Sequence, residues 1–147
     1  MVINFETNQV FKVVTYLGTF LGGIAVSFGQ GWVQDFFKKK QENRLNVEKF
    51  MAKVTDVVAS STASGYTDYP TGAVKARLVK SSAHLERYGQ LDMAKTVRDY
   101  MNKWSTYNNL ILTSIGTPKN LYGDDLKFSI KLKDELDKLT DKILSKS

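Results

Sequence analysis

The residue types that carry most enzyme chemistry are scarce in this chain. His84 is the single histidine, and the 147 residues include no cysteine, which removes thiol nucleophiles, disulfides, Cys-ligated zinc and iron–sulfur clusters. Glu86 lies two positions from His84, and residues at that spacing point to different faces of a helix. We therefore expect His84 to be a surface or partly buried helix residue rather than a catalytic base.

Sequence motifs for phosphate binding, zinc catalysis and acyl transfer are also missing. The chain contains no GxxxxGK[ST], GxGxxG, HExxH or GxSxG pattern, and no paired carboxylates bracketed by turn residues. We predict a non-enzymatic protein with no catalytic residue, no metal, no cofactor and no small-molecule substrate.

The most distinctive spacing belongs to small residues near the amino terminus. Residues 13–34 are uncharged throughout, and a helix of that length rises about 33 Å, enough to cross the roughly 30 Å hydrocarbon layer of a bilayer. Small residues recur every four positions along one ridge of this helix, and a second small pair lies beside the ridge. The ridge is Thr15, Thr19, Gly23, Ser27 and Gly31, and the adjacent pair is Gly18 and Gly22.

Small residues at this spacing let two helix backbones approach closely in lipid. In a soluble helix each of these glycines would cost about 1 kcal/mol relative to alanine. We therefore predict a transmembrane helix over 13–34, preceded by a short tail at 1–12. Its small-residue ridge is expected to pack on a second copy of the chain or on another membrane protein.

Aromatic and basic residues follow the uncharged segment directly. Residues 35–54 carry six positive and three negative charges, whereas residues 1–12 carry one lysine. The positive-inside rule then places the carboxy-terminal domain on the cytoplasmic side of a single-pass membrane protein. Aromatic residues beside lysines are typical of the interface with an anionic inner leaflet. The expected interface residues are Trp32, Phe36, Phe37, Lys38, Lys39 and Lys40.

Three other interpretations of the uncharged segment remain open. The first is a buried core helix of a soluble protein over residues 10–33, because Gln30 and Gln34 make its end less apolar. The second is a cleaved signal peptide, since residues 25–27 resemble a cleavage site, although Glu6 weakens the positive region that should precede it. The third is a glycine-rich β-hairpin, which the lack of strict alternation disfavours.

The remainder of the chain, residues 35–147, has the apolar periodicity of helices. Steps of three and four residues predict an all-α fold in which the transmembrane helix continues into a cytoplasmic bundle of about four helices. Loops are expected near 60–72 and 116–123, where glycine, proline and small polar residues gather. The expected helical ranges are about 47–60, 71–88, 92–115 and 123–143.

Three local expectations accompany this bundle. Asp92 is expected to cap the third helix, whose apolar face should extend to Ile115. The tyrosines of the loop at 60–72 are expected to fold back on the bundle and be half buried. A pI near 9.4 suggests a nucleic acid partner. However, Asp92, Asp99 and Glu86 interrupt the basic residues of the second and third helices, so we predict solvated helix faces and no nucleic acid partner.

Together these patterns predict a membrane-anchored helical protein for interaction or assembly, self-associating or acting as a small subunit of a membrane complex. A first alternative is a pore-forming or membrane-disrupting oligomer, of the holin-like or toxic effector type. A second alternative is a soluble helical binding module with residues 10–33 as its core helix.

Overall fold

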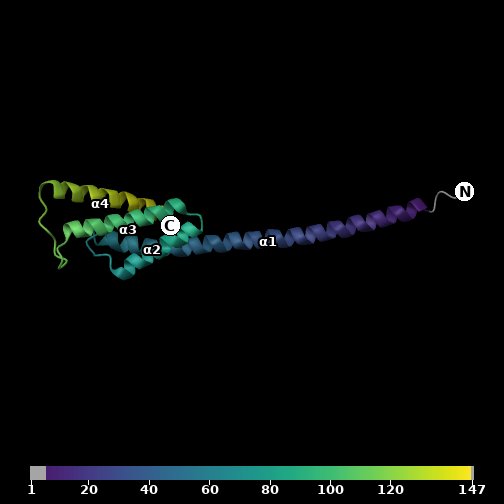
Figure 1. Cartoon of the computed structure of the whole chain (residues 1–147), viewed down its shortest axis with the longest axis horizontal. Helices are drawn as coiled ribbons and strands as arrows, with labels where there is room; N and C mark the ends of the chain where they lie inside the picture. The colour runs from purple at the N-terminus through teal and green to yellow at the C-terminus, as the bar shows by residue number, and fades with distance from the viewer. Residues whose placement is uncertain (1–5, 147) are drawn as a thin grey trace. The chain divides into compact units, whose positions relative to one another are not determined.

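A computed structural model describes the backbone of residues 6–146 and the side chains of residue 29 and residues 31–146. The described backbone is all-helical (Figure 1), with one isolated antiparallel bridge, between Leu112 and Pro118, as its single β-pairing. The prediction of an all-α fold is thereby confirmed. The helices are α1 (Glu6–Ala63), α2 (Gly72–Arg87), α3 (Leu91–Ile111) and α4 (Gly123–Leu144).

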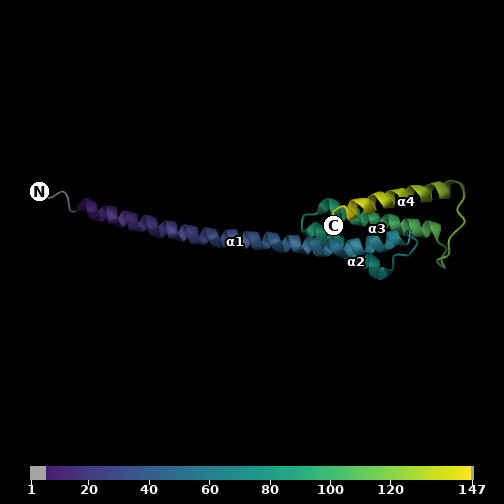
Figure 2. The same ribbon diagram turned by 180° about the vertical axis from the view of Figure 1, so that it is seen from behind.

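The chain divides into two compact units, Met1–Glu42 and Asn43–Ser147. The first unit contains the beginning of α1, and the uncharged residues 13–34 lie within this helix, as predicted. The second unit contains the end of α1 together with α2, α3 and α4, which lie side by side in both views (Figures 1 and 2).

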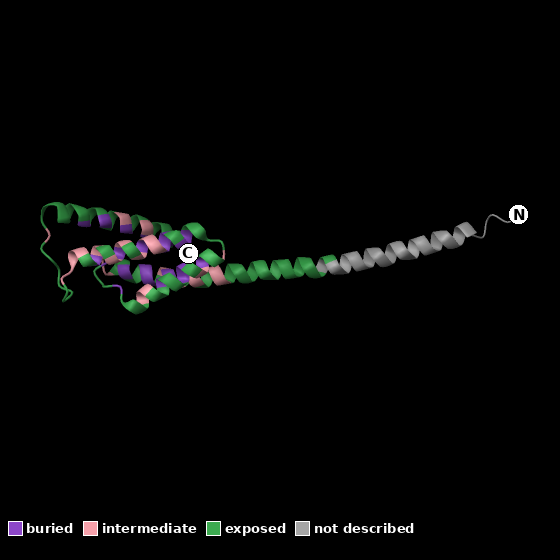
Figure 3. Cartoon of the chain, viewed as in Figure 1, coloured by how far each residue is buried: buried purple, intermediate pink, exposed green. Residues whose placement is uncertain are grey.

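One face of each helical segment in the second unit forms a shared core, coloured purple in Figure 3. The buried residues recur at the three- and four-residue steps read in the sequence, and burying each large apolar side chain contributes about 1.5–3 kcal/mol. The core residues are Met51, Val54, Val57, Val58, Tyr66, Leu78, Leu85, Met93, Ala94, Val97, Tyr100, Trp104, Leu136 and Ile143.

Helix α2 begins and ends within one residue of the predicted range 71–88. The Thr71 side chain accepts a hydrogen bond from the Val74 amide, which caps the first turn. At the other end, Gly89 has a φ of 78°, a conformation that glycine adopts at low cost. The Gly89 amide donates to the Glu86 carbonyl at 3.0 Å, and this turn lets α3 start at Leu91.

Two expectations for α3 are wrong. Asp92 is not its cap, because α3 begins at Leu91 after Gln90, which makes no side-chain capping bond; Asp92 lies in the first turn, near the positive end of the helix dipole. The helix also ends at Ile111, and Ile115 is 86% exposed. The chain turns back there because the Lys119 amide donates to the Ile111 carbonyl at 2.8 Å.

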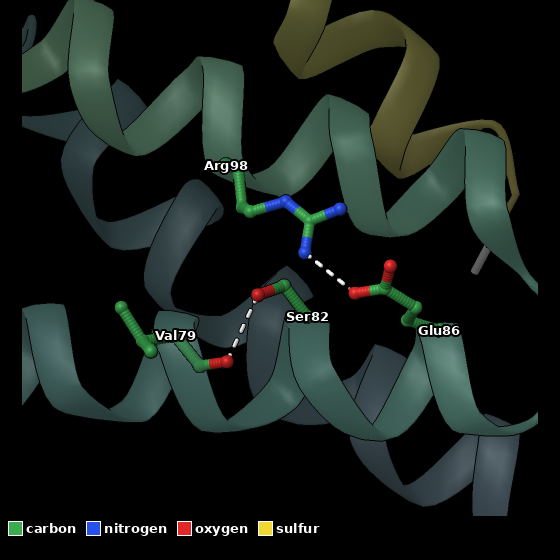
Figure 4. A network of polar contacts seen from close by, with 4 residues as sticks. All are labelled: Val79, Ser82, Glu86 and Arg98. Atoms are coloured by element: carbon green, nitrogen blue, oxygen red, sulfur yellow. Dashed lines mark hydrogen bonds and ion pairs between the residues drawn. The ribbon is translucent and has the colours of Figure 1, made fainter.

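Polar contacts also join α2 to α3 (Figure 4). Arg98 of α3 donates from Nη1 to Glu86 Oε2 of α2 at 2.7 Å, and within α2 Ser82 Oγ donates to the Val79 carbonyl at 2.9 Å. Both charged side chains are about half exposed, so this ion pair contributes at most about 1 kcal/mol.

Candidate membrane-interface segment

Three large aromatic side chains are exposed together in the first unit. Trp32 is 74% exposed, Phe36 57% and Phe37 61%. The rings of Trp32 and Phe36 are stacked with centroids 6.1 Å apart, and those of Phe36 and Phe37 meet edge to face at 6.0 Å. Clustered exposed apolar side chains of this kind mark contacts with another protein or with a membrane.

The lysine triplet that follows is also available for outside contacts. Lys38, Lys39 and Lys40 are exposed, and none of them forms an ion pair within the part of the chain that the structure describes. Arg44 differs, because its Nε donates to Glu48 Oε1 at 2.9 Å, one helical turn away. The predicted interface residues are therefore adjacent and exposed, and the three lysines form no ion pair with Asp35 or Glu42, the carboxylates within one helical turn.

Most of the predicted small-residue ridge lies outside the described side chains. This applies to Thr15, Gly18, Thr19, Gly22, Gly23 and Ser27. Gly31 is described, and a methyl group added there would meet no atom within 4 Å. No contact made by the described residues thus explains why position 31 is glycine, and its packing role stays a prediction.

The predicted membrane span gains no support from the described residues. Among them, no helix contains a stretch that is both long and apolar enough to cross a bilayer. The span over 13–34 falls outside the described side chains except at residues 29 and 31–34. Trp32 and Val33, which the soluble alternative places in a core helix, are both exposed.

Tyr66 organises a polar network in the second unit that the sequence did not reveal. Its hydroxyl donates to Asp137 Oδ1 at 2.6 Å and lies 3.0 Å from Thr140 Oγ1. Its carbonyl accepts from Trp104 Nε1 at 3.2 Å and from Asn108 Nδ2 at 2.7 Å. Tyr66 has a φ of 64°, a strained conformation for a side chain of this size, which these four contacts hold in place.

Burial keeps the tyrosines of this network protonated. Burial raises the pKa of Tyr66 above its ordinary value, and the hydrogen bond to Asp137 raises it further. Burial likewise raises the pKa of Tyr100, whose hydroxyl is hydrogen-bonded to Ser61 Oγ. Neutral phenols with satisfied hydrogen bonds stabilise a fold and are poorly suited to act as bases near neutral pH.

The two tyrosines of the loop between α1 and α2 differ in how far they are buried. Tyr66 is 1% exposed and so is buried rather than half buried, whereas Tyr69 is 53% exposed. Lys75 Nζ lies 5.0 Å from the centroid of the Tyr69 ring, a cation–π contact on the surface. The loop is therefore fixed by Tyr66 and presents Tyr69 to solvent.

His84 packs against α1 and is partly buried, as predicted. Its ring stacks on Phe50 with centroids 4.1 Å apart and an interplanar angle of 8°. The described residues contain no group of three or more His, Asp or Glu side chains placed to hold a metal ion.

No protein-family model, curated protein or solved structure matches the chain. The proposed function therefore rests on the residues of the chain and their geometry.

Proposed function

We propose that the protein is a non-enzymatic, single-pass membrane protein that self-associates through residues 13–34 and presents the second unit as a cytoplasmic interaction domain. The observation that carries this proposal is the exposed aromatic cluster of Trp32, Phe36 and Phe37, directly before three unpaired lysines. This cluster lies at the end of a 22-residue stretch without charge, residues 13–34.

The order of these groups along one helix fits a membrane interface. Aromatic rings favour the headgroup region, where an apolar ring contacts acyl chains while water stays within reach. The lysines beyond them would lie at the anionic surface, where each contributes about 1 kcal/mol of attraction. A purely solvent-facing helix would gain nothing from three exposed rings, since they add apolar surface in water.

Self-association is supported by the small residues. In lipid, helices associate through close backbone contact, and a ridge of small residues permits it. Gly31, the described member of the ridge, is exposed, and no described atom lies near the position that a Cβ would take. A second copy is the simplest partner for such a surface, because the same ridge is then present on both helices.

Extraction of cell membranes with alkaline carbonate tests the anchor. We expect the full chain to remain in the membrane pellet, because peripheral proteins are released and spanning helices are not. The chain lacks cysteine, so Thr7→Cys and Asn102→Cys variants report sidedness with a membrane-impermeant maleimide. In intact cells the maleimide should label position 7 and not position 102. Release of the protein by carbonate would contradict the proposal.

Crosslinking in lipid tests self-association separately. Replacing Gly18, Gly22 and Gly23 by isoleucine should reduce the oligomer fraction, because branched side chains keep the backbones apart. Leu17→Ile with Leu21→Ile is the control, since at about 100° per residue both positions lie on the helix face opposite the small residues and already carry branched side chains. An unchanged oligomer fraction in the triple variant would reject the ridge as the contact.

Release of a dye trapped in liposomes separates this function from the pore-forming alternative. An anchor that only assembles should release no dye at protein-to-lipid ratios that give full membrane insertion. Release that depends on Thr15, Thr19 and Ser27 would instead favour a pore lined by these hydroxyls.

A further inference from the structure

The outward face of α2 is basic, and neither the core nor the proposed membrane anchor accounts for it. The helix contains four Lys or Arg residues and one acidic residue. Lys80 lies two positions beyond Leu78, and Leu78 is buried in the core. Arg87 follows the buried Leu85 at the same spacing. At about 100° per residue, two positions turn a side chain to nearly the opposite side of the helix, so both cations lie on the side away from the core.

The acidic residue of α2 does not neutralise these cations. Glu86 Oε2 accepts a hydrogen bond from Arg98 Nη1 of α3 at 2.7 Å, so its charge is already paired (Figure 4). Lys80, Arg87 and the neighbouring Arg77 are exposed, and none of the three forms an ion pair within the part of the chain that the structure describes. The face therefore presents positive charge that is free to pair with a partner.

Small side chains separate the cations along this side of α2. Ala76 and Ala83 are exposed there, and together with Lys80 and Arg87 they form an outward stripe with steps of four, three and four residues. One helix contacts another along a stripe of this spacing. Alanine side chains also let two helix axes approach closely, toward the lower end of the usual 8–10 Å, about the diameter of one helix. The outward stripe therefore has the spacing and the charge to receive a second helix.

Charge and side-chain size select the partner of the outward stripe. A second copy of the chain would bring cations against cations, because the stripe contains no carboxylate. Helices that lie on a lipid surface insert large apolar side chains, whereas Ala76 and Ala83 are small. Single-stranded nucleic acids stack on aromatic side chains, and the stripe has none. A helix that carries carboxylates matches both the charge and the small side chains.

We propose that the outward stripe of α2 binds an acidic helix of a partner protein. Two carboxylates of that helix, about two turns apart, pair with Lys80 and Arg87, and its backbone lies over Ala76 and Ala83. The inference rests on the proposed role of the second unit as an interaction domain, but not on the membrane anchor, because all these residues belong to the second unit. Carbonate extraction and crosslinking test the anchor alone, so the two proposals can fail separately.

Fluorescence anisotropy of dye-labelled peptides, titrated with the full chain in uncharged detergent micelles, tests the proposal. The probe is an alanine-based helix of about 18 residues with glutamates along one face, at steps of four, three and four. A control peptide of the same composition carries its glutamates at every fifth position, which spreads them around the helix. The one-face peptide should bind at least about fivefold more tightly than the control. Raising the salt from about 0.1 M to 1 M should weaken its binding.

Charge reversal locates the site. Lys80→Glu with Arg87→Glu should weaken binding of the one-face peptide by at least about tenfold. Lys133→Glu with Lys138→Glu makes the same charge change on exposed residues of α4 and should weaken it by at most about twofold. A peptide with lysine in place of glutamate should bind the α2 variant more tightly than the natural chain, a gain that a misfolded variant would not show.

Three results would overturn the proposal outright: equal losses in the two double variants, equal affinity for the two glutamate peptides, or no saturable binding up to about 1 mM. Tighter binding of a uridine oligonucleotide of equal charge, or of inositol trisphosphate as a soluble anionic lipid headgroup, would overturn it in favour of nucleic acid or lipid.

Discussion

The described parts of the two units differ in whether they bury any large apolar side chain. Trp32, Phe36 and Phe37 of the first unit are each more than half exposed, whereas Val54 and Val58, further along the same helix, are completely buried. The second unit buries a shared core between the end of α1 and helices α2, α3 and α4, although Leu91, Ile115 and Tyr122 are exposed. The described residues of the first unit have no such core, which is why we infer that lipid or a second chain covers them.

This contrast predicts that core substitutions affect only the second unit, with the largest effect at its centre. Leu85 is fully buried, so Leu85→Ala should lower the free energy of unfolding by about 2–5 kcal/mol, through lost burial and the cavity that remains. Denaturant unfolding followed by tryptophan fluorescence measures this change. Leu91→Ala is the control: Leu91 is 61% exposed, and its replacement should change stability by at most about 0.5 kcal/mol. Similar losses in both variants would mean that the described core is wrong.

The polar network should be the next most sensitive feature. Tyr66→Phe keeps the ring but leaves Asp137 and Thr140 without the tyrosine hydroxyl, so we expect a loss of about 1–2 kcal/mol in the free energy of unfolding. Tyr122→Phe removes a hydroxyl from a side chain that is 78% exposed and should have no measurable effect. A neutral Tyr66→Phe variant would show that the loop does not depend on this hydroxyl.

The buried tyrosines also set how the second unit responds to alkaline pH. Because burial raises the pKa of Tyr66 above the ordinary value of 10.0, the protonated form is favoured in the folded chain. The resulting stability is fully present below pH 10 and is lost as pH rises through the higher folded-state pKa. Unfolding curves between pH 8 and pH 11.5 should show this decline, and it should be shallower in Tyr66→Phe. A decline that starts below pH 9 would have another origin.

The smallest effect on stability is expected in the first unit. Replacing Phe36 and Phe37 together by serine removes two exposed rings and should change the free energy of unfolding of the second unit by less than about 0.5 kcal/mol. The same variant should still float with vesicles, because residues 13–34 remain, but brominated lipid should quench its Trp32 fluorescence less than that of the natural chain. A large loss of stability would show that these rings pack on the protein itself.

Local signals in the sequence were sufficient for the helices but not for the contacts between distant residues. The range 71–88 predicted both ends of α2 to within a residue, because the Thr71 cap and the left-handed Gly89 that fix them act within one turn. The end of α3 was missed because it depends on Lys119, eight residues beyond Ile111, folding back. The hydrogen bond from Tyr66 to Asp137 joins residues 71 positions apart, and no periodicity reveals such a pair.

The exposure of the aromatic and basic residues was predictable for a similar reason, since their run is local in the sequence, whereas their contact with a membrane stays a prediction. Exposure of Trp32 and of the lysines agrees with that prediction, whereas the small-residue ridge depends on side chains that lie mostly outside the described residues. A pocket lined by Leu112, Lys119 and Tyr69 had no sequence signal, because its walls come from a helix end, a turn and a separate loop.

Quenching of Trp32 fluorescence by brominated lipid tests most directly whether the aromatic cluster contacts a membrane. The chain has two tryptophans, and Trp104 is 3% exposed within the core of the second unit, so Trp32→Phe leaves a signal that lipid should not reach. We predict strong quenching of the natural chain in vesicles with bromine near the headgroups, and none in the variant. Equal fluorescence of the natural chain in brominated and unbrominated vesicles would contradict the membrane-interface assignment.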